Sequence, residues 1–264
     1  QMCIRDSVCV ARQGTVAVLM KEDDVSYVRL YDKKGQELAS GEFYQEKGSF
    51  PVDIALAPDA QKLAVDMLDV TKGKTCSTVT FYNFGSVGQN EIDNNVGTYS
   101  YKNTMISELV YTESGKLLAI SDAGLIWFDG AQKPAPKKQI KFKREIQSVF
   151  YNNKYVGISY SDTKKENSWH IKVYDMNGKT VMENDTEIAY NRIELLDNNE
   201  ICVRDDYNCE LFTIHSIRKF RYTFDRQLYN VLSGSDGQNY TLVLNGEIEE
   251  VRLQSVSYTH LTLP

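Results

Sequence analysis

The chain has 264 residues, of which 42% are hydrophobic, 25% charged and 11% aromatic, and its formal net charge is −6. These values exclude a disordered chain, a collagen-like repeat and a disulfide-stapled miniprotein, and they leave enough apolar material for one large or two small domains. The sequence lacks an apolar run of the length that a membrane-spanning helix needs. Its acidic balance argues against a nucleic-acid partner.

The two ends of the chain are related to each other at the level of DNA. Gln1–Asp6 back-translate to a string whose reverse complement contains codons for Val256–His260. This inverted element resembles the mosaic-end adapter of transposase-based sequencing libraries. We therefore interpret residues 1–7 and 255–264 as adapter-derived and not native, and residues 8–254 as natural material from a longer protein. We expect both end segments to lie outside the fold.

Short β-strands follow one another from the start of the natural material. Period-two alternation in Thr15–Met20 and Val25–Leu30 predicts two strands, and turn residues 32–35 come next. Val8–Ala11 precedes this pair as a first strand, and Glu37–Phe43 follows as a fourth. No convincing amphipathic helix occurs in the sequence.

The same strand order recurs along the chain, and the third strand of each of the first five units ends near an aromatic residue. The predicted first three strands of units two to six are 52–59, 62–68 and 78–83; 106–111, 116–122 and 125–129; 146–151, 155–160 and 170–175; 192–196, 200–203 and 210–214; 228–233, 240–244 and 248–253. The predicted fourth strands of units two to five are 96–101, 137–142, 179–184 and 218–224.

The spacing of the units indicates their architecture. The third-strand aromatics are Tyr31, Tyr82, Phe128, Tyr174 and Phe212, with separations of 51, 46, 46 and 38 residues. Propeller blades repeat every 40–50 residues or so, and each blade has four antiparallel strands. The sequence therefore predicts an all-β fold, a β-propeller with six visible blades, the last without a fourth strand, from an incomplete seven- or eight-bladed ring. A β-sandwich is the alternative, but sandwich strands do not repeat in groups of four.

The cysteines and histidines of the natural segment form no recognisable metal or disulfide framework. They are Cys9, Cys76, Cys202, Cys209, His170 and His215. No CxxC pair occurs, so we expect no zinc site. Cys202 and Cys209 flank Asp205–Asp206 symmetrically, and a tight hairpin there brings them close. Whether they pair or remain separate thiols on neighbouring strands stays open, because cross-strand geometry often misses the required Cβ spacing.

Several turn motifs resemble those of known propellers. Ala57–Val65 resembles the SPDG turn of WD40-like propellers, with Ala57 in place of Ser and Ala60 in place of Gly. The segments 31–35, 127–130 and 174–178 resemble the repeat of quinone-cofactor propellers. Those enzymes carry a tryptophan motif in blade after blade, whereas this chain has two tryptophans. We interpret the three segments as strand ends followed by a turn whose glycine adopts positive φ.

No motif in the sequence identifies a catalytic, cofactor-binding or metal-binding residue. The carboxylate pairs Asp23–Asp24, Asp205–Asp206 and Glu249–Glu250 are the nearest approach to glycosidase chemistry, which needs two carboxyls that face each other in a cleft. The first two pairs fall in predicted turns, and adjacent residues on a strand point to opposite faces. We expect solvated side chains at these pairs and no cofactor, while scattered aspartates leave calcium open.

Two basic stretches fall on predicted outer strands. They are Lys133–Arg144 and Arg218–Tyr222. Alternation places Ile140 and Phe142 on one face, with Lys141 and Lys143 on the other. Lysine and arginine on an edge strand guard it against pairing with another chain. A polyanion-binding role is the alternative.

Residues 8–254 as a whole resemble an uncharacterised propeller-type family of Gram-positive, clostridia-like bacteria. The strings at 106–129 and 210–225 carry the resemblance most clearly. Members resemble single-pass membrane proteins with a short cytosolic start and a propeller ectodomain. The resemblance implies an extracytoplasmic, cell-surface location through an anchor missing from this chain, and it brings no catalytic residues.

These observations lead to one expected function and one alternative. We expect a non-enzymatic propeller ectodomain that binds a protein or cell-wall partner through one face. The alternative is a propeller enzyme, a glycan hydrolase or lyase, recognisable by carboxylates or histidines that converge at the central channel. Since the sixth unit lacks a fourth strand, we also expect an open seam between residues 8–43 and 228–254.

Overall fold

The computed structural model describes residues 5–22, 25–44, 49–84, 95–161 and 167–253. These residues form 23 β-strands and no helix, so the described part of the chain contains no helix able to cross a membrane. The all-β prediction is confirmed. The chain divides into two compact units, an N-terminal unit of residues 1–144 with Met176–Gly178 and a C-terminal unit of residues 145–175 and 179–264.

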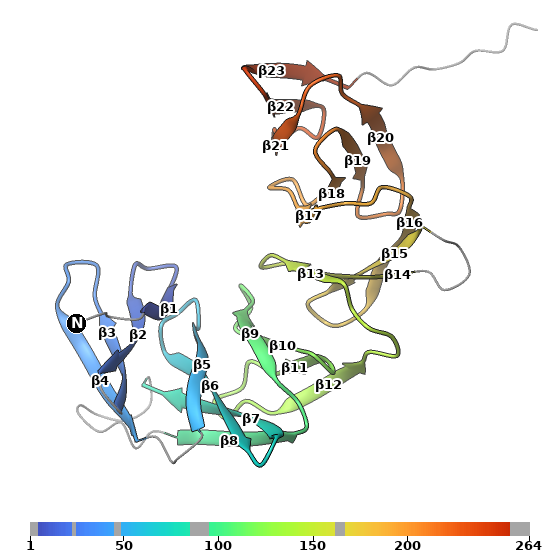
Figure 1. The fold of residues 1–264 in the computed structure, drawn as a ribbon. Coiled ribbons are helices and arrows are strands. Elements are labelled where there is room, and N and C mark those ends of the chain that lie inside the picture. The colour runs from blue at the N-terminus through green and yellow to red at the C-terminus, as the bar shows by residue number, and fades with distance from the viewer. Residues whose placement is uncertain (1–4, 23–24, 45–48, 85–94, 162–166, 254–264) are drawn as a thin grey trace, which may run out of the picture. The chain divides into compact units, whose positions relative to one another are not determined.

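The described strands form six antiparallel sheets in chain order, five with four strands and one with three (Figure 1). The N-terminal unit holds blades 1 to 3: β1 (Arg5–Val10), β2 (Val16–Glu22), β3 (Val25–Tyr31), β4 (Glu37–Tyr44); β5 (Ser49–Leu56), β6 (Lys62–Thr71), β7 (Lys74–Asn83), β8 (Asn95–Lys102); β9 (Ile106–Tyr111), β10 (Leu117–Ser121), β11 (Gly124–Phe128), β12 (Pro136–Lys141). The C-terminal unit holds blades 4 to 6: β13 (Ser148–Tyr151), β14 (Tyr155–Ser161), β15 (Trp169–Asp175), β16 (Thr180–Thr186); β17 (Arg192–Leu195), β18 (Ile201–Arg204), β19 (Asn208–Phe212), β20 (Arg218–Thr223); β21 (Leu228–Ser233), β22 (Asn239–Leu244), β23 (Glu247–Arg252).

The predicted strands agree with the observed ones within a few residues, with two corrections. β7 begins at Lys74 and not at Thr78, because the turn at Lys72 and Gly73 lets the ladder with β6 continue to Thr71. The expectation that residues 1–7 lie outside the fold is wrong for residues 5–7, which extend the ladder of β1 along β2. Residues 1–4 and 255–264 lie outside the described residues, and the adapter origin of the ends stays a hypothesis.

The core of each unit lies between consecutive blades. In the N-terminal unit one apolar cluster joins blades 1 and 2, and another joins blades 2 and 3 around the edge-to-face pair Phe81–Phe128. In the C-terminal unit, equivalent clusters join blades 4 and 5, and blades 5 and 6. The first strands of neighbouring blades lie beside each other: β1, β5 and β9 in one unit, and β13 and β17 in the other. This is the arrangement expected of propeller blades.

The turn between the first and second strands repeats in five blades. In each of them one residue has positive φ; these residues are Gly14, Ala60, Gly115, Asn199 and Gly237. The glycine interpretation of the strand-end motifs is confirmed for Gly35 and Gly178, with φ of 81° and 72°. It is wrong for Gly130, whose φ is not positive. A Cβ at Gly130 would lie 3.1 Å from the Gly115 carbonyl oxygen, so close approach accounts for that glycine.

Candidate functional site

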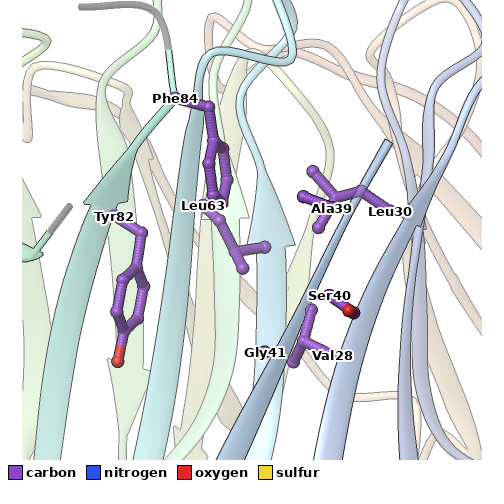
Figure 2. A pocket seen from close by; sticks show the side chains of 8 residues that line it. All are labelled: Val28, Leu30, Ala39, Ser40, Gly41, Leu63, Tyr82 and Phe84. Atoms are coloured by element: carbon purple, nitrogen blue, oxygen red, sulfur yellow. The ribbon is translucent and has the colours of Figure 1, made fainter. Parts of the chain in front are cut away.

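An apolar groove opens between blades 1 and 2 (Figure 2). It is lined by Val28, Leu30, Ala39, Ser40, Gly41, Leu63, Tyr82 and Phe84. Val28, Leu30 and Leu63 are buried because they belong to the core between these blades. Figure 2 shows the hydroxyls of Ser40 and Tyr82 among otherwise hydrocarbon side chains.

A second groove occupies the equivalent place between blades 5 and 6. Its lining residues are Cys209, Leu211, Phe220, Val231, Tyr240, Leu242, Val251 and Leu253. In both grooves, the third and fourth strands of one blade face the neighbouring blade. The enclosed space in each groove is about 10 Å³, room for about one water molecule. Small-molecule pockets usually measure roughly 300–1,000 Å³. The grooves are therefore shallow gaps between packed blades and are too small to take up a side chain or ring of a partner.

Three aromatic rings form a row beside the second groove: Phe220 and Tyr222 on β20, and Phe224 directly after its end. Phe220 and Tyr222 stack with their centroids 5.9 Å apart, because residues two apart on a strand share a face. Tyr222 meets Phe224 edge to face at 4.9 Å. Tyr222 is 54% exposed although its neighbours hold it on both sides. The aromatic row therefore presents a rigid, amphipathic ring to solvent.

The basic residues of β20 face carboxylates. Arg218 lies 3.0 Å from Glu210, Lys219 lies 2.6 Å from Glu200, and Arg221 lies 3.6 Å from Glu187. β20 is the outer strand of its sheet, as predicted. Because each of these cations has a carboxylate partner, the pairing does not favour the alternative of a polyanion site at 218–222.

The first basic stretch also falls on an outer strand, β12. Ile140 and Phe142 are half-buried while Lys141 and Lys143 are exposed, which confirms the predicted alternation. Within this stretch, Lys137 forms an ion pair with Asp129 at 3.2 Å. Exposed lysines on an edge strand fit the protective role that the sequence suggested.

The carboxylate pairs singled out in the sequence do not form a cleft among the described residues. Asp205 accepts hydrogen bonds from the backbone N–H groups of Tyr207 and Asn208, so it stabilises the hairpin between β18 and β19. Glu249 and Glu250 lie on the edge strand β23. Asp23 and Asp24 lie outside the described residues.

A different pair of acids, Asp53 and Asp66, lies inside the N-terminal unit. The two residues are opposite each other on β5 and β6. Asp53 accepts hydrogen bonds from the Leu109 N–H at 2.7 Å and from the Ser7 hydroxyl at 2.8 Å, so one carboxylate links the first strands of three blades. Asp66 accepts a hydrogen bond from the Ser77 hydroxyl at 3.3 Å, and its Oδ1 has no hydrogen-bond partner among the described residues.

Burial makes this acid pair chemically unusual. It raises the pKa of Asp66 to about 7, and the neighbouring Asp53 carboxylate raises it further against the effect of Ser77. Burial also raises the pKa of Asp53, against the effect of its hydrogen bonds. Two carboxyls with shifted pKa values resemble an acid–base pair. However, the Asp66 side chain is fully enclosed, so a substrate has no path to it.

One feature of the sequence indicates a buried acid here, although strand alternation alone does not predict it. Lys62–Thr71 is a mostly apolar strand, and Asp66 stands in its middle where a core residue is expected. An acid at a core position indicates a buried carboxyl that needs partners. The partner across the sheet, Asp53, is a long-range pairing that the strand pattern alone does not identify.

Comparisons with known proteins give a family and a fold. Residues 2–253 match the model of a family of unknown function, DUF5711. No curated protein matches. Among solved structures, a eukaryotic initiation factor is similar with a TM-score of 0.63 and 12% identity over 93% of this chain and 62% of that chain. At this identity the likeness shows the fold alone, and it agrees with the four-stranded antiparallel blades of a β-propeller-type architecture.

Two further structures show weaker similarity. Raptor from Chaetomium thermophilum has a TM-score of 0.49 and 11% identity over 96% of this chain and 24% of that chain. The WD40 domain of Pan2 from Neurospora crassa has a TM-score of 0.38 and 8% identity over 97% of this chain and 91% of that chain.

Proposed function

We propose that this chain, which belongs to the DUF5711 family of unknown function, is a non-enzymatic β-propeller platform that binds a partner at the outer surface of a bacterial cell. The proposal includes the membrane anchor that the sequence resemblance implies. The partner is a cell-wall glycan or a protein.

The aromatic row beside the second groove is the observation that carries the proposal. An exposed aromatic ring held in place by its neighbours gives a large contact area with little loss of conformational freedom on binding. Its flat face suits the apolar face of a sugar as well as an apolar side chain.

Co-sedimentation with purified peptidoglycan tests the cell-wall partner. We expect the full chain to sediment with the polymer, and Tyr222→Ala to weaken binding by roughly tenfold, the effect of a lost aromatic contact. Tyr229→Ala is the matched control, because Tyr229 is 49% exposed on β21 and lies outside the aromatic row. Equal binding by both variants would contradict a role for the aromatic row. If the chain does not bind peptidoglycan at all, a protein remains as the candidate partner.

The acid pair supports a second candidate, a glycan hydrolase or lyase. Catalysis by Asp53 and Asp66 requires the site to open, because Asp66 is enclosed. We expect no release of reducing ends or unsaturated sugars from peptidoglycan. Turnover by the native chain that disappears in both Asp53→Asn and Asp66→Asn, while the folded fraction stays unchanged, would establish the enzyme instead.

A further inference from the structure

The two buried cysteines of blade 5 lie against each other. The Sγ atoms of Cys202 and Cys209 are 3.8 Å apart, and both side chains are inaccessible to solvent. Both residues belong to the apolar cluster between blades 5 and 6. In the structure they are thiols, one on β18 and the other on β19, which is the separate-thiol arrangement that the sequence left open.

The register of the hairpin explains why the two sulfurs meet. Cys202 is opposite Leu211, and Cys209 is opposite Arg204, so the cysteines are diagonal neighbours on one face of the sheet. The connection between the strands is short and is held by Asp205. A disulfide requires an S–S distance of about 2 Å and a Cβ···Cβ distance of about 3.8 Å, whereas diagonal neighbours on a sheet lie farther apart. Closure of the pair therefore needs rotation about χ1 together with a local shift of the hairpin backbone.

We propose that Cys202 and Cys209 are a redox site that closes to an intrachain disulfide between β18 and β19 by exchange with a small-molecule disulfide. One cysteine thiolate attacks a sulfur of the oxidant and releases one small thiol. The second cysteine then attacks the mixed disulfide and releases the other. The protein loses two protons and two electrons in total, and the oxidant is reduced to two thiols.

The surroundings set the conditions under which this exchange occurs. Contact with the Cys209 thiol and burial both raise the pKa of the Cys202 thiol, and the thiolate is the reactive form. The closed hairpin therefore reacts slowly, and exchange takes place during folding or when the hairpin opens. Since the site lies in the core, the proposal does not depend on the binding function.

Peptide mapping of the full chain tests the proposal. The reduced chain is refolded from urea with oxidised glutathione, its free thiols are alkylated, and it is digested with trypsin. Cleavage after Arg192, Arg204 and Arg218 places the two cysteines on separate peptides, 193–204 and 205–218. We expect most chains to yield these peptides joined, with the mass of two hydrogens lost and the link cleaved by a phosphine. Free or singly glutathionylated Cys202 and Cys209 in most folded chains would overturn the proposal.

Variants and stability give a second readout. Cys202→Ala is expected to abolish the cross-linked pair, whereas the double variant Cys9→Ala/Cys76→Ala, altered on β1 and β7, is expected to retain it. Closing the short loop should raise the melting temperature of the oxidised chain by roughly 3–8 °C over the reduced chain. If Cys202→Ala does not fold, peptide mapping of the native chain still shows whether the disulfide forms. A lower melting temperature of the oxidised chain would show a strained, non-native link and overturn the proposal.

Discussion

The two units bury acidic side chains in different ways. In the C-terminal unit each deeply buried glutamate has a cation beside it: Glu210 lies 3.0 Å from Arg218, and Glu200 lies 2.6 Å from Lys219. In the N-terminal unit, the groups that act on Asp66 are the Ser77 hydroxyl and the Asp53 carboxyl, neither of which carries positive charge. A buried carboxyl with such neighbours is most stable when it is protonated.

This difference teaches that a blade can accommodate a buried acid beside a cation or as a protonated acid, and that the second solution is sensitive to pH. In an ion pair, the nearby cation compensates the charge of the glutamate. A protonated aspartic acid stabilises the fold only while it keeps its proton. We therefore expect the N-terminal unit to be sensitive to pH near neutrality through Asp66.

The largest expected effect is the pH dependence of the N-terminal unit. The pKa of Asp66 in the folded chain is about 7, above the value of about 3.9 in an unfolded chain. The stabilisation is therefore fully present below about pH 4 and is lost as pH rises to about 7, a change of roughly 4 kcal/mol. Asp66→Asn should remove this loss. Urea unfolding between pH 4 and 8, followed by Trp127 fluorescence in a Trp169→Phe background, measures it.

The same experiment contains its own control. Trp169 lies on β15 of the C-terminal unit, so a Trp127→Phe background reports the other unit. Asp66→Asn should leave that second signal unchanged at every pH. An unaltered pH dependence of the Trp127 transition in Asp66→Asn would show that Asp66 is already ionised in the folded chain.

Removal of a cation from the C-terminal unit should have the next largest effect. Lys219→Met leaves Glu200 and the Tyr240 hydroxyl without the ammonium group that both contact, and we expect a loss of about 3 kcal/mol. Adding Glu200→Gln should restore part of it, because the unpaired charge is then absent. Arg221→Met is the matched control on the same strand, since both partners of its ion pair are about half-exposed, and should cost less than about 1 kcal/mol. Denaturant unfolding followed by Trp169 tests all three.

The smallest expected effect concerns a turn and does not depend on charge. Ala60 adopts φ of 57°, which is unfavourable for a residue with a Cβ. Ala60→Gly should stabilise the N-terminal unit by about 1 kcal/mol. Gly115→Ala, at the same turn of the next blade, should destabilise it by a similar amount. Because neither change alters a charge, equal shifts at pH 5 and pH 8 are expected, and a shift at one pH alone would contradict the turn explanation.

The sequence predicted most of the fold because each blade is made of local signals. Alternation, turn residues and the aromatic end of each third strand lie within one repeat, so they identified the strands of all six sheets. The start of β7 was predicted less accurately, since Lys74–Cys76 carries little alternation. We predicted from their codons that residues 5–7 lie outside the fold. They extend the β1–β2 ladder because a backbone of any sequence can pair with a neighbouring strand. The predicted open seam between residues 8–43 and 228–254 stays a prediction.

The candidate site was less predictable because it depends on contacts between residues of different strands. The sequence identified Arg218–Tyr222 as basic, but the partners Glu187, Glu200 and Glu210 come from other strands. It identified exposed carboxylate pairs and missed Asp53 and Asp66, which become neighbours through the pairing of β5 with β6. The order of residues along the chain shows neither which side chains are enclosed nor which side chains they contact.

The carboxyl ¹³C chemical shift of Asp66, followed through a pH titration of the native chain, tests the central claim most directly. The claim is that this acid is enclosed and has a raised pKa, which is the basis of the pH sensitivity that we expect of the N-terminal unit. We predict a titration midpoint near pH 7, which falls in Asp53→Asn because the neighbouring carboxylate is then gone. A midpoint at or below about pH 4, the value of a solvated aspartate, would contradict the claim.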